Sequence, residues 1–338
     1  MRTAILWFLR MLFGVVMACS GLAAAQEQPV EITVRGRQPG PPLWRVSNGE
    51  NELWIFPMLS PVPKDMLWDD TKVAAIIAQA DAAIARPDTD VALSALTKFN
   101  PINLVRGLRL ARRLGRNPDG GDLESALPPY VYARFSTVKA ERFPRNDDIE
   151  ELRPLFAGGR MMEAVREQEE LVSSRDISRR IERLLKRNKS LERISVEVEL
   201  DMKGSFRSLA TRAETFVESI PPELELACFE FQLRRVERDI DAMKYRADSW
   251  ARGYIDEFLG VPLPGDDEDP CLQIATAGSE QELVQGMQAE LDQRWLDEAA
   301  RALVTYRSTF AILGITELLR EDGLLAALTA KGYEINVP

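Results

Sequence analysis

The feature that most constrains the fold is a long apolar seam in the second half of the chain. Pro221 and Pro222 open it, and apolar residues then recur at steps of three and four. This spacing predicts a helix over residues 223–259, roughly 55 Å long at the usual rise per residue. Either another helix of the same chain covers the seam, or two copies pair through 223–259 as a homodimer. The seam comprises Leu226, Phe229, Leu233, Val236, Ile240, Met243, Ala247, Trp250 and Tyr254.

Strand patterns lie on both sides of this helix, near the two ends of the chain. Two apolar runs flank Asn48 and Gly49, which is typical of a β-hairpin. Residues 98–306 are otherwise mostly helical, apart from one alternating segment. The order predicts an α/β fold in a single domain, 43–338, with a mixed central sheet of N- and C-terminal segments and a large helical middle insert. The expected strands are 43–46, 53–56, 194–200, 309–313 and 333–337.

The first 25 residues resemble a secretory signal peptide. Their only charges are Arg2 and Arg10, and three alanines precede Gln26. We expect cleavage after Ala25, export to the periplasm or the medium, and a flexible lead-in over residues 26–42. An uncleaved anchor is the alternative, although its 15 uncharged residues are short for a membrane span. A weak lipobox offers another alternative, in which a lipidated Cys19 tethers the protein to a membrane.

The charge of the chain limits the partners that it can bind, and its cysteines indicate the compartment in which it folds. The chain has 43 basic and 53 acidic side chains, so it carries a net charge of −10. Such an acidic chain is not expected to bind nucleic acid. Cleavage after Ala25 leaves Cys228 and Cys271, which predicts a disulfide in an oxidising compartment. Two separate buried thiols are the alternative.

The chain contains no histidine. This excludes Ser-His-Asp and Cys-His catalysis, zinc sites that need imidazole, and H-E-x-x-H proteases. The sequence also lacks a G-x-S-x-G turn, a Walker A loop and G-x-G-x-x-G. Proton transfer or metal binding would therefore depend on carboxylates, lysines, tyrosines and hydroxyls, which are too abundant for spacing to single one out.

Residues 43–64 and 309–333, at opposite ends of the chain, resemble conserved segments of the TraB/GumN family, which also includes the Tiki proteases. Residues 43–47 and 53–64 are similar to the family's first strand pair, whose second strand ends in G-x-x-H before a Leu-Pro step. Residues 309–318, with the Gly-Leu-Leu of 323–325 and Gly332-Tyr333, are similar to the second G-x-x-H and the elements after it. Segments 226–228 and 250–253 resemble the long helical insert. The resemblance covers nearly all of residues 43–338 and implies the same α/β fold.

The departures from the family pattern fall on its presumed metal site. The family's histidines and glutamates are thought to form a metal-dependent hydrolytic site where the motifs meet. Ser60 stands at the first motif's histidine, and Glu317 at the second. Arg86 stands at a family glutamate, and Glu197 matches another. A serine hydroxyl is a poor substitute for imidazole, and a guanidinium repels a divalent cation.

The resemblance and its departures favour a protein without metal-dependent hydrolase activity. We expect it to bind an unknown peptide or envelope component in the inherited cleft, with no cofactor. The alternative is an atypical hydrolase or peptidase that uses Glu197 and Glu317 in place of histidine, with a divalent metal. A structural envelope protein that dimerises through 223–259 is a third hypothesis. The candidate cleft positions are Ser60, Arg86, Glu197 and Glu317.

Overall fold

The computed structural model describes the part of the chain that carries both motifs and most of the middle. Residues 1–39 lie outside it, so the signal peptide, most of the lead-in and the Cys19 tether stay predictions. In the described part, no helix is both long and apolar enough to cross a membrane. The described residues are 40–93, 101–202, 205–261, 269–275 and 281–336.

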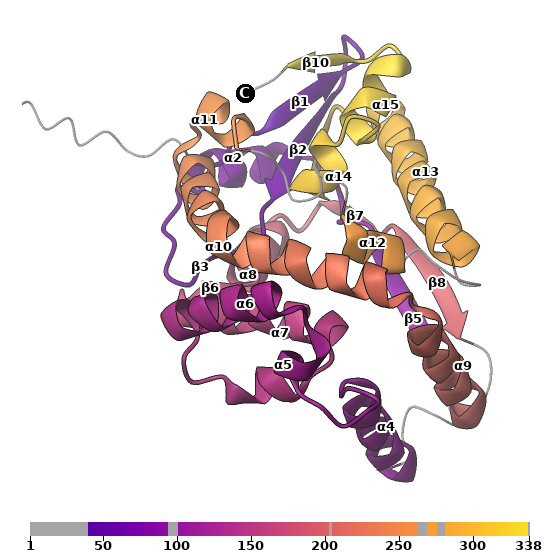
Figure 1. Ribbon diagram of the computed structural model, residues 1–338. Helices are drawn as coiled ribbons and strands as arrows, with labels where there is room; N and C mark the ends of the chain where they lie inside the picture. Colours follow the sequence, from indigo (N-terminus) through magenta and orange to yellow (C-terminus); the bar gives the residue numbers. More distant parts are fainter. Residues whose placement is uncertain (1–39, 94–100, 203–204, 262–268, 276–280, 337–338) are drawn as a thin grey trace, which may run out of the picture. The chain divides into compact units, whose positions relative to one another are not determined.

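A six-stranded mixed sheet joins the two ends of the chain, as the sequence predicted (Figure 1). The strand order is β10-β1-β2-β9-β4-β7. β1 is antiparallel to both β10 and β2, whereas β2, β9, β4 and β7 all run in the same direction. The six strands are β1 (Trp44–Ser47), β2 (Glu52–Met58), β4 (Ala82–Ile84), β7 (Glu192–Ile194), β9 (Ser308–Gly314) and β10 (Glu334–Asn336).

The predicted hairpin joins β1 and β2. Gly49 takes a positive φ of 98°, which a glycine adopts without steric cost. The Asn48 carboxamide oxygen accepts hydrogen bonds from the backbone N–H groups of Glu50 and Asn51, at 3.1 and 2.8 Å. The Asn48 side-chain nitrogen donates to the carbonyl of Leu303 at 2.7 Å. This asparagine therefore shapes the turn and also fastens it to the C-terminal half of the chain.

The strand predicted over 194–200 proves to be two strands. β7 belongs to the central sheet, but β8 (Glu197–Met202) pairs with β5 (Asp88–Leu93) in a separate two-stranded sheet. Pro87 lies between β4 and β5 and has no N–H to donate, so the ladder is interrupted there. Pairing resumes directly afterwards, where Asp88 N–H donates to the Val196 carbonyl at 3.0 Å.

Helices fill the middle of the chain, as predicted, and cover the sheet. A further two-stranded sheet pairs β3 (Val62–Pro63) with β6 (Leu171–Val172). The helices are α2 (Thr71–Gln79), α4 (Pro101–Leu114), α5 (Leu123–Ala126), α6 (Pro129–Arg142), η1 (Asp147–Glu151), α7 (Pro154–Gln168), α8 (Arg175–Arg187), α9 (Phe206–Ser219), α10 (Pro222–Arg252), α11 (Ile255–Leu259), α12 (Pro270–Ala275), α13 (Gln281–Thr305), α14 (Ile315–Leu319) and α15 (Leu324–Ala330).

The long predicted helix is α10, and it ends earlier than expected. Gly253 adopts the left-handed conformation that closes a helix, so α11 is a separate helix and Tyr254 is outside the seam. From Phe229 to Trp250 the seam residues are buried against α6, α7 and other parts of the same chain. This is the intramolecular alternative. Because the seam is already buried within the chain, it no longer gives a reason to expect a homodimer through 223–259. That homodimer stays an untested hypothesis.

The core has two main parts, which α10 connects. One lies against the central sheet, and the other is a helical cluster drawn from residues 123–243. Trp250, near the end of α10, packs edge-on against Phe56 of β2, with ring centroids 5.7 Å apart. Its indole N–H also donates to the carbonyl of Pro57 at 2.8 Å. The middle insert is thereby fastened to the strand that ends at the first motif.

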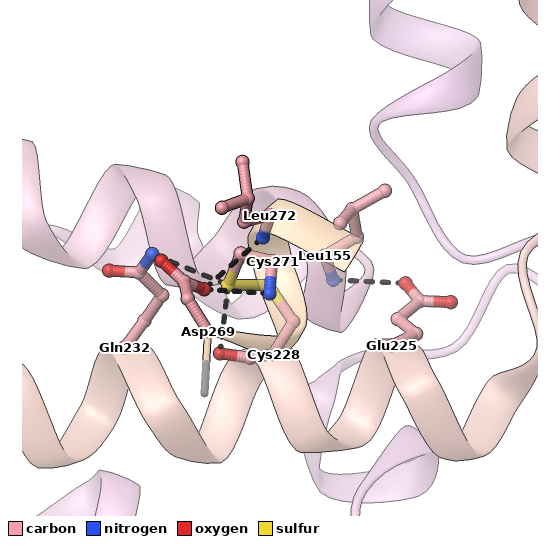
Figure 2. The surroundings of a disulfide bond; sticks show 7 residues. All are labelled: Leu155, Glu225, Cys228, Gln232, Asp269, Cys271 and Leu272. Atoms are coloured by element: carbon pink, nitrogen blue, oxygen red, sulfur yellow. Dashed lines mark hydrogen bonds between the residues drawn. A yellow bond between two sulfur atoms is a disulfide. The ribbon is translucent and has the colours of Figure 1, made fainter. Parts of the chain in front are cut away.

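The predicted disulfide joins Cys228 of α10 to Cys271 of α12, with 4.8 Å between the Cα atoms (Figure 2). Asp269 directly precedes α12, and its carboxylate accepts hydrogen bonds from the N–H groups of Cys271 and Leu272. Ile220 and Ile274 are buried beside the bond. The disulfide holds a short helix on a long one and closes a span of 43 residues.

Candidate functional site

The four candidate positions follow the same edge of the central sheet. The parallel strands β2, β9, β4 and β7 end at this edge, in that spatial order. Ser60 follows β2, Glu317 follows β9, Arg86 follows β4 and Glu197 follows β7. The carboxyl edge of parallel strands is where α/β proteins commonly bind ligands. The backbone therefore brings the two motifs to one edge of the sheet.

Arg86 and Glu317 make a direct ion pair at this edge. The Arg86 Nη2 donates to Glu317 Oε1 at 2.9 Å, although the residues are 231 positions apart. The carboxylate is folded back over Gly314, where an added Cβ would come within 1.9 Å of Glu317 Oε2. The residue that replaces the family's second histidine is thus held by the arginine that replaces a family glutamate.

Ser60 and Glu197 stay apart from this pair. Ser60 is exposed, and in the described residues its hydroxyl makes no hydrogen bond. The Glu197 side chain is exposed and has no ion pair within the described part of the chain. Its main-chain carbonyl accepts from Arg294 Nη1 of α13 at 3.0 Å. The sheet edge therefore brings together two of the four candidates in direct contact, and the other two only as neighbours along the edge.

These residues do not fit a divalent metal. Across the residues described, no group of three acidic or cysteine side chains is arranged as a metal-binding set. The Glu317 carboxylate, the best placed oxygen donor at the edge, already binds a guanidinium. A metal at this position would face the positive charge of Arg86 and would lack a neutral imidazole ligand.

A cavity of about 450 Å³ opens between the segment after β3, the end of α7 and the last turns of α10. Lys64 lies 3.8 Å from Glu170, and Lys244 forms a close ion pair with Glu169. Glu170 has a positive φ of 51°, which is uncommon for any residue except glycine. The lining residues are Pro63, Lys64, Asp65, Met66, Leu67, Glu169, Glu170, Lys244, Asp248 and Ala251.

The sequence did not predict this cavity. None of the four candidate positions lines it, but its first residue, Pro63, lies only three positions after Ser60. Its charged residues are of common surface types and come from three distant segments, so no spacing pattern marks them. Trp250 was predicted as a seam residue and as part of the insert that resembles the family, but its bond to Pro57 had no sequence signal.

The comparison with known families agrees with the geometry of the sheet edge. A sequence model of the TraB/PrgY/gumN family matches residues 42–337, which include both motif segments and the whole middle insert. No curated protein and no solved structure matches the chain. Since the match covers nearly the whole chain, including the strands that precede Ser60, Arg86 and Glu317, the chain belongs to the TraB/PrgY/gumN family.

Proposed function

We propose that this chain is an exported TraB/GumN-like protein of the cell envelope that binds a ligand and has no metal-dependent hydrolase activity. The ion pair between Arg86 and Glu317 is the observation that carries the proposal. Glu317 Oε1 already accepts a hydrogen bond from Arg86, so this oxygen is not free to take a proton from a substrate. A divalent cation bound to Glu317 would also face the positive charge of the Arg86 guanidinium.

The cavity beside α10 supports ligand binding. Its volume lies within the range of about 300–1,000 Å³ that is usual for small-molecule sites. It presents two lysines and four acids next to Leu67, which is 83% exposed. Side chains of both signs beside an apolar surface suit a short peptide that carries both charges. A polyanion does not suit them, because acids outnumber lysines.

The first test concerns metal and turnover. Protein purified without chelators is examined by elemental analysis, and the wild type and Glu317→Gln are compared on peptidase and esterase substrates. We expect no stoichiometric metal and no turnover in either protein. Metal at one equivalent, or turnover that Glu317→Gln abolishes, would overturn the proposal. Arg86→Gln is the matched variant, because it frees Glu317 without removing the carboxylate.

The second test concerns the cavity. Binding of the tripeptide Lys-Leu-Glu is measured by calorimetry with the wild type, Lys244→Gln and Lys186→Gln. Lys244 lines the cavity, whereas Lys186 is an exposed lysine of α8 in an i,i+4 ion pair. We expect about fivefold weaker binding for Lys244→Gln, as for the loss of one partly exposed charge contact, and unchanged binding for Lys186→Gln. Equal affinity in all three proteins would exclude the cavity as the peptide site.

A further inference from the structure

Helix α4 leaves large apolar side chains in solvent. Leu104, Val105 and Leu108 are 66%, 46% and 57% exposed, and no residue of α4 is buried. Its main neighbour is α9, and Figure 1 shows the two helices side by side, away from the central sheet. On the inner side, an added Cβ on Gly107 would lie 3.7 Å from the Phe206 ring. The outer side of α4 therefore carries apolar groups that no described part of the chain buries.

The same helix is strongly basic in an acidic chain. Residues 101–118 contain five arginines and no acid, whereas the whole chain carries a net charge of −10. Two of these arginines are paired within the fold, since Arg113 contacts Glu214 and Arg116 contacts Glu151. The other three, Arg106, Arg109 and Arg112, are exposed and make no ion pair with any residue that the structure describes.

The apolar and basic groups form one continuous surface. At 100° per residue and with Leu104 at 0°, Leu108 lies at about 40°, Arg112 at about 80° and Val105 at about 100°. Arg109 follows at about 140° and Arg106 at about 200°. Leu104 and Leu108 are thus neighbours, and the arginines begin beside Leu108 and continue around one side. A face that mixes apolar side chains with arginines suits a helix in a membrane interface, because the arginine stems lie along the apolar groups while the guanidinium groups reach the lipid phosphates.

Helix α8 shows that basic residues alone do not produce this surface. It also carries exposed arginines, but its apolar residues Ile177, Ile181, Leu184 and Leu185 are all buried in the core. The apolar face of α8 is thus buried inside the molecule. In α4 the corresponding apolar groups remain exposed.

We propose that α4 binds the surface of an anionic lipid bilayer and makes this protein a peripheral membrane protein. The charge of the helix selects this occupant. Phosphate headgroups complement Arg106, Arg109 and Arg112, while the acyl boundary receives Leu104 and Leu108. A second copy of the chain fits less well, because a twofold contact through this face would place arginines opposite arginines.

Vesicle sedimentation of purified protein from cells that express the full chain tests the proposal. All proteins carry Cys19→Ser, which removes the possible lipid anchor. We expect binding to vesicles that contain phosphatidylglycerol and little binding to pure phosphatidylcholine. The triple variant Arg106→Gln/Arg109→Gln/Arg112→Gln should bind on the order of 100-fold more weakly, at about fivefold per arginine.

Two further variants distinguish the bilayer from other partners. Leu104→Ser/Leu108→Ser keeps every charge and should lower binding by about tenfold, because the apolar contact is lost. The variant Arg175→Gln/Arg183→Gln/Arg187→Gln removes the same charge from α8. It should bind the vesicles as tightly as the protein with both helices unaltered.

Three results would overturn the proposal. The first is no sedimentation, and the second is an equal loss with the α8 variant. The third is full binding by the leucine variant, which would indicate a charge contact with a soluble polyanion or an acidic protein. The replaced side chains of α4 and α8 are all exposed, so circular dichroism should show unchanged folding.

Discussion

Replacing Glu225 should destabilise the protein because it breaks a buried ion pair. It lies in the first turn of α10, and its carboxylate accepts two hydrogen bonds from Arg153, at 2.8 and 2.6 Å. It also accepts from the N–H of Leu155 at 2.9 Å, in the first turn of α7 (Figure 2). The side chains of Arg153 and Glu225 are only 11% and 9% exposed. One carboxylate thus joins the beginnings of two packed helices.

The expected cost follows from what the pair leaves behind. Glu225→Gln keeps the shape but removes the negative charge, and its amide nitrogen must face a guanidinium N–H. At least one charge-assisted hydrogen bond is lost, worth about 1.5–3 kcal/mol, and Arg153 stays buried without a counter-charge. Breaking a buried pair on one side costs about 3–5 kcal/mol. Because glutamine retains one acceptor oxygen, we expect a loss of about 3 kcal/mol.

Urea unfolding at neutral pH measures this loss, with Asp176→Asn as the control. Asp176 pairs with Arg179 on the surface, where both side chains are about two-thirds exposed, so its loss should change the stability by less than about 1 kcal/mol. The double variant Arg153→Met/Glu225→Leu should be more stable than Glu225→Gln, since no charge is left buried. Equal effects of Glu225→Gln and Asp176→Asn would refute the reasoning.

Three more outcomes are expected. Cys228→Ser should cost about 4 kcal/mol on the chain-entropy account, and added reductant should then have no further effect on unfolding. Arg134 holds the pKa of Glu237 below its usual value, so the Glu237 carboxylate stabilises the fold above about pH 4.5 and loses this effect as the pH falls through the lowered pKa. The stability gap between the wild type and Glu237→Gln should therefore close in acid; a constant gap would contradict this. Gly314→Ala should destabilise the wild type by about 1 kcal/mol because its methyl displaces the Glu317 carboxylate, yet it should be neutral or stabilising in a Glu317→Ala background. Additive effects in that double-variant cycle would show that the contact is unimportant.

Local signals explain what the sequence predicted of the fold. The Asn48–Gly49 turn, the apolar strands and the seam of α10 each depend on neighbours within a few residues, so their patterns are visible in one sequence. The end of α10 at Gly253 had a signal, a glycine after a periodic run, but the apolar spacing across it was read as continuous. The division of 194–200 into two strands had no signal within that segment, since its cause is Pro87, which lies between the neighbouring strands β4 and β5.

The site divides in the same way. Family resemblance placed Ser60 and Glu317 after strands, and Arg86 and Glu197 on strands. In the structure Arg86 comes after β4 and Glu197 begins β8, and the strands that precede all four residues end at one edge. Which side chains touch depends on strand order and rotamers, and the sequence carries no direct record of either. The Arg86–Glu317 contact was therefore not predictable from spacing. The exposed leucines of α4 were also invisible, because an amphipathic helix looks the same whether or not the fold covers it.

The position of β9 has a consequence for how the chain is made. β9 lies between β2 and β4, so two strands from the first quarter of the chain are joined only through residues 308–314. The helical cluster within residues 123–243 can form while synthesis continues, but the sheet must wait for the last residues to leave the ribosome. Until then, β2 and β4 present open edges to their surroundings. These edges therefore stay unpaired until residues 308–314 are made, and any stop codon before β9 removes the centre of the sheet.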